Sequence, residues 1–301
     1  MYCAGVLTFD GGFMDSSSSR TKCITKRLQT SRCPLLTRSK PEILKHGGKG
    51  GKTEVFRWDQ IRPKIFIMSP SRTEKIFTRI YAENSWGDRE SKSGAGSGIA
   101  RTESLRPALT RLALDLEIHS LLDLPCGDFN WMRHTDLPGI DYTGIDIVQP
   151  LIERNQAMYT QPGRRFLRLD MLCDTLPRTD LILCRDGFVH LSFGDITRAL
   201  RAMHDSGPEY LLVTTFIAHP RNREISTGGW RPLNLAIGPF YFPPPLCTLA
   251  DCPPNGSFPD KALALYRFSV LSARLPELER IFRSGKLLPE ALQRMLARLR
   301  R

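Results

Sequence analysis

The sequence predicts an α/β fold in which a mostly parallel sheet carries helices on both faces. Two observations lead to this prediction. Apolar segments of strand length alternate with helical segments between residues 103 and 216. An acidic residue also closes the first three strand segments, at Asp123, Asp146 and Asp170, with intervals of 23 and 24 residues. One acid for each strand–helix unit places three carboxylates at one edge of a parallel sheet, where such folds bind their ligands.

Length and composition are those of a globular protein with a sizeable core. The chain has 301 residues, 41% of them hydrophobic, and its apolar runs are too short to cross a bilayer. The net charge of +12 lies in the ends: residues 1–75 carry +9 and residues 272–301 carry +5, whereas residues 76–271 carry −2. A nucleic-acid partner is therefore not favoured.

The eight cysteines include no CxxC pair, so we expect no metal site and a reducing compartment.

Three segments are expected along the chain. Residues 1–73 form a basic, low-complexity extension for which we predict disorder. Residues 74–272 form the folded domain, and residues 273–301 form a basic helical tail. The stretch of residues 16–41 has seven basic residues and no acid, as transit peptides do. Targeting to a mitochondrion or plastid is therefore the alternative to a cytoplasmic location.

Each secondary-structure element has a local signal. Strands are expected where short apolar or alternating runs end at turn residues, and helices where apolar residues recur at helical spacing. The expected strands are residues 121–124, 141–147, 165–170, 179–184, 210–216 and 262–270. The expected helices are residues 75–83, 103–116 (capped by Thr102), 129–135, 149–159, 195–204 and 287–301.

Two loops have an unusual composition. Residues 86–98 are polar and rich in glycine, so this loop is either a plain linker or a lid over the ligand site. Residues 219–259 are rich in proline and aromatic residues, and a long irregular segment of this kind is commonly functional. We interpret it as a substrate loop in which Trp230, Arg231 and Asn234 offer an aromatic wall, an anion contact and an amide. Packing within the loop is the alternative.

The three acids suit the parts of a nucleoside cofactor. A carboxylate such as Asp146 accepts both hydrogen bonds of a ribose diol. Asp123 is placed to orient an amino group, and Asp170 with Met171 to meet the edge and face of an adenine. A helix cap after a strand is the alternative role for any single acid, but three acids in phase weaken that interpretation.

Four ordered segments resemble the motifs of class I S-adenosylmethionine (SAM)-dependent methyltransferases: LLDLPCGD at 121–128, GID at 144–146, LDM at 169–171 and LILCRD at 181–186. The run DLPCGDFNWM, from residue 123 to 132, is similar to the first motif of a subgroup of methyltransferase-like proteins. The resemblance covers roughly residues 76–271. It implies a Rossmann-like methyltransferase fold with seven strands and a reversed last strand, SAM bound across the carboxyl ends of the strands, and methyl transfer to an acceptor.

The resemblance also implies a set of cofactor residues: Asp123, Gly127, Asp128, Asp146, Ile147, Asp170, Met171 and Arg185. Asp123 and Gly127 would flank the methionine part of SAM. One departure stands out, because the three glycines of the family's first turn correspond here to Pro125, Gly127 and Phe129. A methyltransferase-like binding module without catalytic activity therefore stays open as a rival. An NAD-dependent dehydrogenase is disfavoured, since the first strand is not followed by GxGxxG.

Asp186 and His190 are the candidate catalytic residues. They follow the fourth strand, where substrate and methyl group would meet, and their spacing of four residues suits one side of a helical turn. His190 is the candidate base for a protonated nucleophile, with a buried structural histidine as the alternative. A small-molecule acceptor is favoured, and RNA or protein bound through the basic tails is second.

Overall fold

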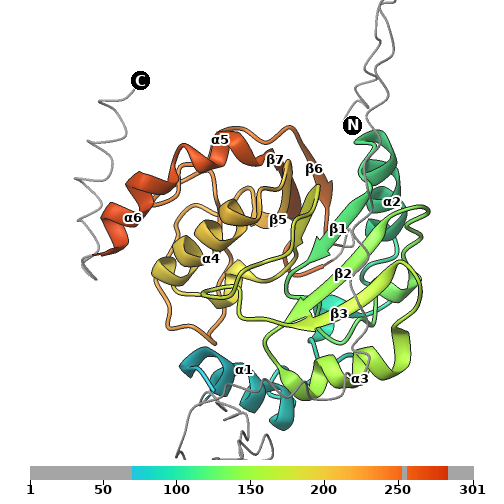
Figure 1. Cartoon of the computed structure of the whole chain (residues 1–301). Coiled ribbons are helices and arrows are strands. Elements are labelled where there is room, and N and C mark those ends of the chain that lie inside the picture. The colour runs from blue at the N-terminus through green and yellow to red at the C-terminus, as the bar shows by residue number, and fades with distance from the viewer. Residues whose placement is uncertain (1–69, 253–255, 284–301) are drawn as a thin grey trace, which may run out of the picture. The chain divides into compact units, whose positions relative to one another are not determined.

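The computed structural model describes residues 70–252 and 256–283, and these residues form one mixed sheet with helices on both faces (Figure 1). The seven strands are β1 (Ser120–Asp123), β2 (Asp141–Asp146), β3 (Arg164–Arg168), β4 (Leu181–Cys184), β5 (Tyr210–Phe216), β6 (Cys247–Ala250) and β7 (Lys261–Arg267). Their order in the sheet is β3-β2-β1-β4-β5-β7-β6. Strands β1 to β5 pair in parallel, whereas β7 runs antiparallel to both β5 and β6. The predicted fold class is confirmed, including the seven strands and the reversed strand.

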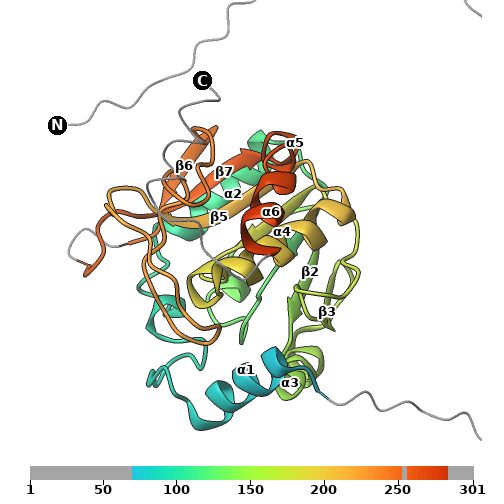
Figure 2. The ribbon, with the colours of Figure 1, turned by 90° about the vertical axis from the view of Figure 1, so that its left-hand side faces the viewer.

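Six α-helices accompany the sheet within the described residues. They are α1 (Arg72–Glu83), α2 (Leu105–Asp115), α3 (Gln149–Tyr159), α4 (Phe193–Ser206), α5 (Phe268–Ser272) and α6 (Leu275–Arg283). The side chains of α2 and α3 pack on one face of the sheet, and those of α4, α5 and α6 pack on the other (Figures 1 and 2). Helix α1 lies across the end of the sheet at which the parallel strands stop. The carboxyl ends of the parallel strands therefore lie next to α1.

The central strands are buried on both faces, which explains their nearly continuous apolar sequence. All four residues of β4 and all seven of β5 are buried. In β1, Leu122 faces the layer of α4 to α6, and Leu121 faces the layer of α2 and α3. Each such leucine contributes about 1.5–3 kcal/mol on burial. The strand that carries the first acid is therefore held from both sides, and Asp123 is placed firmly at its end.

Two local predictions on this side of the sheet are wrong. Thr102 does not cap α2, because its hydroxyl binds back to the carbonyl oxygens of Gly98 and Ile99. Residues 129–135 do not form a helix beyond the 3₁₀ turn Met132–His134. Phe129 has a φ of 59°, which is outside the right-handed helical region.

Helices α1 and α6 are the first and last elements of the described residues. Ser71 caps α1 by accepting a hydrogen bond from the amide of Glu74. At the other end, Leu275 and Leu278 of α6 belong to the core. The folded unit therefore extends past the predicted boundary at residue 272. The predicted helix 287–301 and nearly all of the extension 1–73 lie outside the described residues. None of the helices in the described ranges has the length and apolarity to cross a membrane.

Candidate functional site

A pocket of about 1000 Å³, including its open mouth, lies at the carboxyl ends of β1, β2 and β4. Nine predicted site residues line it: Asp123, Gly127, Asp146, Ile147, Asp170, Met171, Arg185, Asp186 and His190. Helix α1 supplies a further wall with Thr73, Phe77 and Tyr81. Sequence reasoning missed this wall, although the four-residue spacing of the three side chains places them on one helix face.

The turn after β1 forms without the missing glycines. Gly127 has a φ of 56°, and a Cβ atom there would lie 2.2 Å from the hydroxyl oxygen of Ser93. Phe129 also adopts a left-handed conformation, which costs a non-glycine residue about 1–3 kcal/mol. Its ring packs among Tyr142, Tyr159 and Phe166 at centroid distances of 5.0–5.2 Å. Burial of the ring offsets the backbone cost, so aromatic packing replaces a glycine at this position.

Asp146, at the end of β2, is fixed by the turn that it faces. One carboxylate oxygen accepts the amide of Gly127 at 3.2 Å, and the other accepts the amide of Val148 at 3.0 Å. Burial raises the pKa of Asp146 to about 6, although these amides act in the opposite direction. The carboxylate is therefore ionised at neutral pH and rigidly oriented beside the pocket.

Asp123, at the end of β1, has a partner that the sequence did not reveal. The hydroxyl of Tyr142 donates a 2.7 Å hydrogen bond to the Asp123 carboxylate, and both groups are buried. Burial raises the pKa of Asp123 to about 7, with the Tyr142 hydrogen bond acting against it. Because Tyr142 occupies one oxygen, the carboxylate keeps acceptor capacity for one further donor.

The raised pKa values of Asp123 and Asp146 predict that the contribution of these two groups to stability falls as pH rises. Protonated forms of these acids favour the folded state, so their stabilisation is present below pH 3.8 and is lost as pH rises through about 6 to 7. Urea unfolding at about pH 5 and about pH 8 measures the decline. The variant Asp123→Asn should show a shallower decline, because Asn keeps the Tyr142 bond without the charge. If Asp123→Asn lost as much unfolding free energy between the two pH values as the unmodified protein does, Asp123 would not contribute to the decline.

Asp170 and Met171 lie beyond β3, at the mouth of the pocket near α1. One Asp170 oxygen accepts the hydroxyl of Ser71 at 3.1 Å, and the other accepts the amide of Leu172 at 2.9 Å. The carboxylate thus links the start of α1 to the end of β3. Met171 lines the pocket beside it.

Asp128 requires a correction, because it does not line the pocket. Its carboxylate instead binds the glycine-rich loop, accepting the Ser91 hydroxyl at 3.0 Å, the Lys92 amide at 2.9 Å and the Ser93 hydroxyl at 3.2 Å. Asp128 therefore holds the loop of residues 86–98 against the turn. This loop contributes Trp86, Lys92, Ser93 and Ser97 to the pocket wall.

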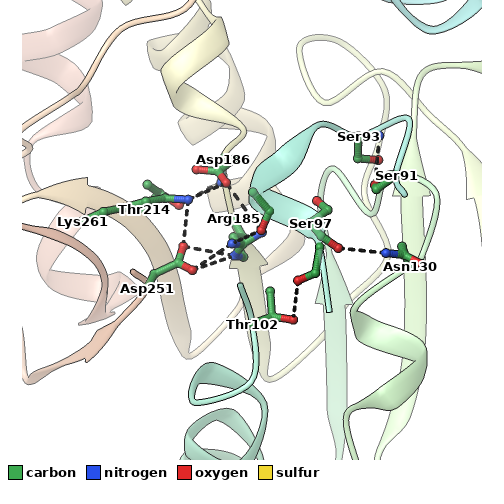
Figure 3. A network of polar contacts seen from close by, with 12 residues as sticks. Ser91, Ser93, Ser97, Thr102, Asn130, Arg185, Asp186, Thr214, Asp251 and Lys261 are labelled. Carbon is green, nitrogen blue, oxygen red and sulfur yellow. Dashed lines mark hydrogen bonds and ion pairs between the residues drawn. The ribbon is translucent and has the colours of Figure 1, made fainter. Parts of the chain in front are cut away.

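Arg185 belongs to a buried network of four charges (Figure 3). Its guanidinium binds the Asp251 carboxylate at 2.8 Å and the carbonyl oxygen of Gly96 at 2.7 Å. Lys261 binds Asp251 at 3.1 Å and Asp186 at 2.7 Å. Because Arg185 is held by protein groups, we assign it to the pocket wall and to the anchoring of the glycine-rich loop. Sequence reasoning missed Asp251 and Lys261, for which no local motif gives a signal.

The same network removes Asp186 as a candidate base. Burial alone would raise its pKa, but the charges of Lys261 and Arg185 outweigh burial and hold the pKa well below its usual range. A carboxylate with so low a pKa accepts protons poorly at neutral pH. The role that remains for Asp186 is to hold Lys261 and Arg185 at the pocket wall.

His190 has the geometry of a base. Its Nδ1 lies 2.8 Å from the carbonyl oxygen of Gly229, and since a carbonyl only accepts, Nδ1 carries the proton. The lone pair of the neutral ring is therefore on Nε2. Burial lowers the pKa of His190, although the Gly229 bond acts against it. The ring is thus neutral at pH 7, and its centroid lies 4.9 Å from that of Trp86.

The three predicted substrate residues lie on different sides of their loop. Arg231 is fully buried and binds the carbonyl oxygens of Phe188 and Val189, and burial lowers its pKa to about 10. Asn234 is buried and binds the carbonyl oxygen of His219. Neither side chain lines a cavity, because Arg231 binds backbone carbonyls after β4 and Asn234 binds the backbone at the start of its own loop. Trp230 is 41% exposed and lines a second cavity beside the first.

The sheet order and the reversed β7 define the class I methyltransferase fold, with the pocket at the carboxyl ends of the strands. No family model and no curated protein sequence matches the chain. Solved structures with a similar fold include human N-acetylserotonin methyltransferase in complex with SAM, with 15% identity and a TM-score of 0.43 over 65% of this chain and 60% of that chain. The 1,6-didemethyltoxoflavin-N1-methyltransferase of Burkholderia thailandensis, solved with S-adenosylhomocysteine, has 16% identity and a TM-score of 0.47 over 67% and 91%. The N-methyltransferase NodS of Bradyrhizobium japonicum WM9 has 17% identity and a TM-score of 0.43 over 56% and 96%.

Proposed function

We propose that the protein is a SAM-dependent methyltransferase that acts on a small-molecule acceptor. The observation that carries the proposal is the placement of three carboxylates, from Asp123, Asp146 and Asp170, at successive strand ends around one pocket. SAM presents an ammonium group, a ribose diol and an adenine amino group, which are all hydrogen-bond donors. An acceptor-rich floor therefore fits the molecule.

The residues of the pocket suit the parts of SAM one by one. Asp146 would hold the ribose diol, and Asp123 would hold the ammonium group with the oxygen that Tyr142 leaves available. Ile147 and Met171 would enclose the adenine, with Asp170 at its edge. When bound, SAM supplies a methyl group on a positively charged sulfur. The pocket aligns the two reactants, and alignment is the main requirement for this reaction.

His190 would accept the proton of the acceptor. Its Nε2 lone pair is available, and the lowered pKa keeps the ring unprotonated at neutral pH. A base in this position is needed when the nucleophile is a hydroxyl or a protonated amine. The formation of the turn around Gly127 and Phe129 removes the main support for a binding module without activity.

The proposal is tested by incubating the protein with SAM that carries a labelled methyl group and with mixtures of phenols, carboxylic acids, amines, RNA and unfolded protein. Transfer of label to a small-molecule class, with release of S-adenosylhomocysteine, is the expected result. Label in RNA or protein alone would contradict the small-molecule acceptor. Absence of transfer to every class would contradict the enzyme.

The variant Asp146→Asn is expected to weaken SAM binding by at least about tenfold, because one charged acceptor of the diol becomes a donor. Isothermal titration calorimetry measures the change. Asp141→Asn is the matched control, since Asp141 is the exposed first residue of the same strand. Equal affinities of the two variants would show that Asp146 does not hold the ribose.

A further inference from the structure

A second cavity of about 970 Å³, including its mouth, adjoins the first. The two share five wall residues: Trp86, Ser93, Arg185, Asp186 and His190. The glycine-rich loop, which Asp128 and Arg185 hold in place, supplies residues to the walls of both cavities. A molecule in the second cavity would therefore meet one in the first beside His190.

Aromatic rings dominate one side of the second cavity. Phe216, Trp230 and Phe258 pack together, with centroid distances of 6.2 Å for Phe216–Trp230, 5.5 Å for Phe216–Phe258 and 5.2 Å for Trp230–Phe258. Trp230 is 41% exposed, and Phe258 and Trp86 are each 37% exposed. Exposed large aromatic side chains that gather around one cavity mark a binding site for an apolar, flat partner.

Backbone pairing explains why Trp230 faces this cavity. The amide of Gly228 donates to the carbonyl oxygen of His190 at 2.9 Å, and the amide of Arg231 donates to that of Val189 at 3.1 Å. Arg231 points into the protein from this paired segment, whereas Trp230, the residue before it, is exposed to the cavity. Since Gly229 also binds the His190 ring, one short segment positions both the base and the aromatic wall.

The charges of the second cavity leave one cation without an acidic partner. Arg185 and Lys261 are matched by Asp186 and Asp251 in the buried network. Arg101 also lines the cavity, is exposed, and forms no ion pair with any acid of the described ranges. A guanidinium in this setting favours a carboxylate, which it can bind through two parallel hydrogen bonds.

We propose that the second cavity binds the methyl acceptor and that the acceptor is a flat aromatic hydroxy acid; this inference rests on the proposed function. Trp86, Trp230 and Phe258 contact the ring, and Arg101 binds the carboxylate. The hydroxyl oxygen forms a bond to the methyl carbon as the carbon–sulfur bond breaks. The sulfur keeps the electron pair, the hydroxyl proton passes to Nε2 of His190, and the products are the methyl ether and S-adenosylhomocysteine.

Three probes test the chemistry in the presence of S-adenosylhomocysteine. Hydroxynaphthoate has the ring, the hydroxyl and the carboxylate; naphthol lacks the carboxylate; and hydroxycyclohexane carboxylate lacks the aromatic ring. Calorimetry is expected to show that hydroxynaphthoate binds at least about tenfold more tightly than hydroxycyclohexane carboxylate. Similar affinities for these two probes would overturn the aromatic assignment.

Variants then locate the binding site. Trp230→Ala should weaken hydroxynaphthoate binding by at least about tenfold and leave the affinity for S-adenosylhomocysteine unchanged. Arg101→Gln should weaken hydroxynaphthoate binding but not naphthol binding. Leu246→Ala is the control, because Leu246 is 57% exposed and lies outside the cavity; it should change neither affinity.

The results distinguish a failure of the proposed acceptor class from a failure of the proposed methyltransferase function. Normal S-adenosylhomocysteine binding with no hydroxynaphthoate binding, or with binding that Trp230→Ala does not affect, overturns the acceptor class and leaves the methyltransferase proposal standing. Absence of S-adenosylhomocysteine binding in the unmodified protein overturns the proposed function itself.

Discussion

The variant His190→Gln is expected to lower the rate of methyl transfer by about two to four orders of magnitude while leaving SAM affinity unchanged. Glutamine keeps an N–H group for the carbonyl oxygen of Gly229, but its amide does not accept a proton at neutral pH. The variant should therefore have a lower kcat and an unchanged SAM affinity. Single-turnover methyl transfer and a parallel SAM titration separate the two quantities.

The pH profile distinguishes a base from a structural histidine. Because burial lowers the pKa of His190, the unmodified protein should keep full activity at pH 7 and lose it as pH falls below the ordinary histidine value of 6.5. The profile of His190→Gln should lack this decline. His119→Gln is the control, since His119 is exposed and lies outside both cavities. A fall in SAM affinity equal to the fall in rate would contradict a role in proton transfer.

The variant Asp251→Ala is expected to reduce the free energy of unfolding by about 3–5 kcal/mol, the typical loss when one partner leaves a buried ion pair. The Asp251 side chain is fully buried and faces two cations, with Arg185 4% exposed and Lys261 12% exposed. Without the Asp251 carboxylate, Arg185 and Lys261 have only Asp186 as an acidic partner within the network. Urea denaturation should show a lower midpoint with an unchanged slope.

An exposed ion pair provides the matched control. Glu209, the residue before β5, pairs at 2.8 Å with Arg267 at the end of β7, but both side chains are more than half exposed. Glu209→Ala should therefore cost less than about 1 kcal/mol. If Asp251→Ala and Glu209→Ala lowered the stability equally, the network would not hold the sheet end together.

Asp251→Ala should also slow methyl transfer, because Arg185 anchors the glycine-rich loop.

The strand ends were predictable because their signals are local. A buried strand reads as a short apolar run, and the acid that ends it occupies the next position in the sequence. The positions of Asp123, Asp146 and Asp170 at one sheet edge follow from this pattern and from parallel pairing. The turn at Phe129 was not predictable, because the three rings that stabilise it come from β2, α3 and β3.

Features that depend on pairing between distant segments could not be predicted from the sequence. Strand β6 has only four residues, three of them exposed, and it is defined by its pairing with β7. The Arg185–Asp251 contact joins residues 66 positions apart, and no local motif marks it. For Trp230, Arg231 and Asn234, the sequence gives the residue types, but the pairing of the loop with residues 188–190 decides which of them faces a cavity.

Calorimetric titration of the purified protein with SAM, and separately with NADH, tests whether the pocket at the strand ends is a SAM site. We expect SAM to bind at one site per chain with a dissociation constant of about 1–100 µM, and NADH not to bind. Absence of heat from SAM at high micromolar concentration, or binding of NADH in its place, would contradict the assignment of the pocket.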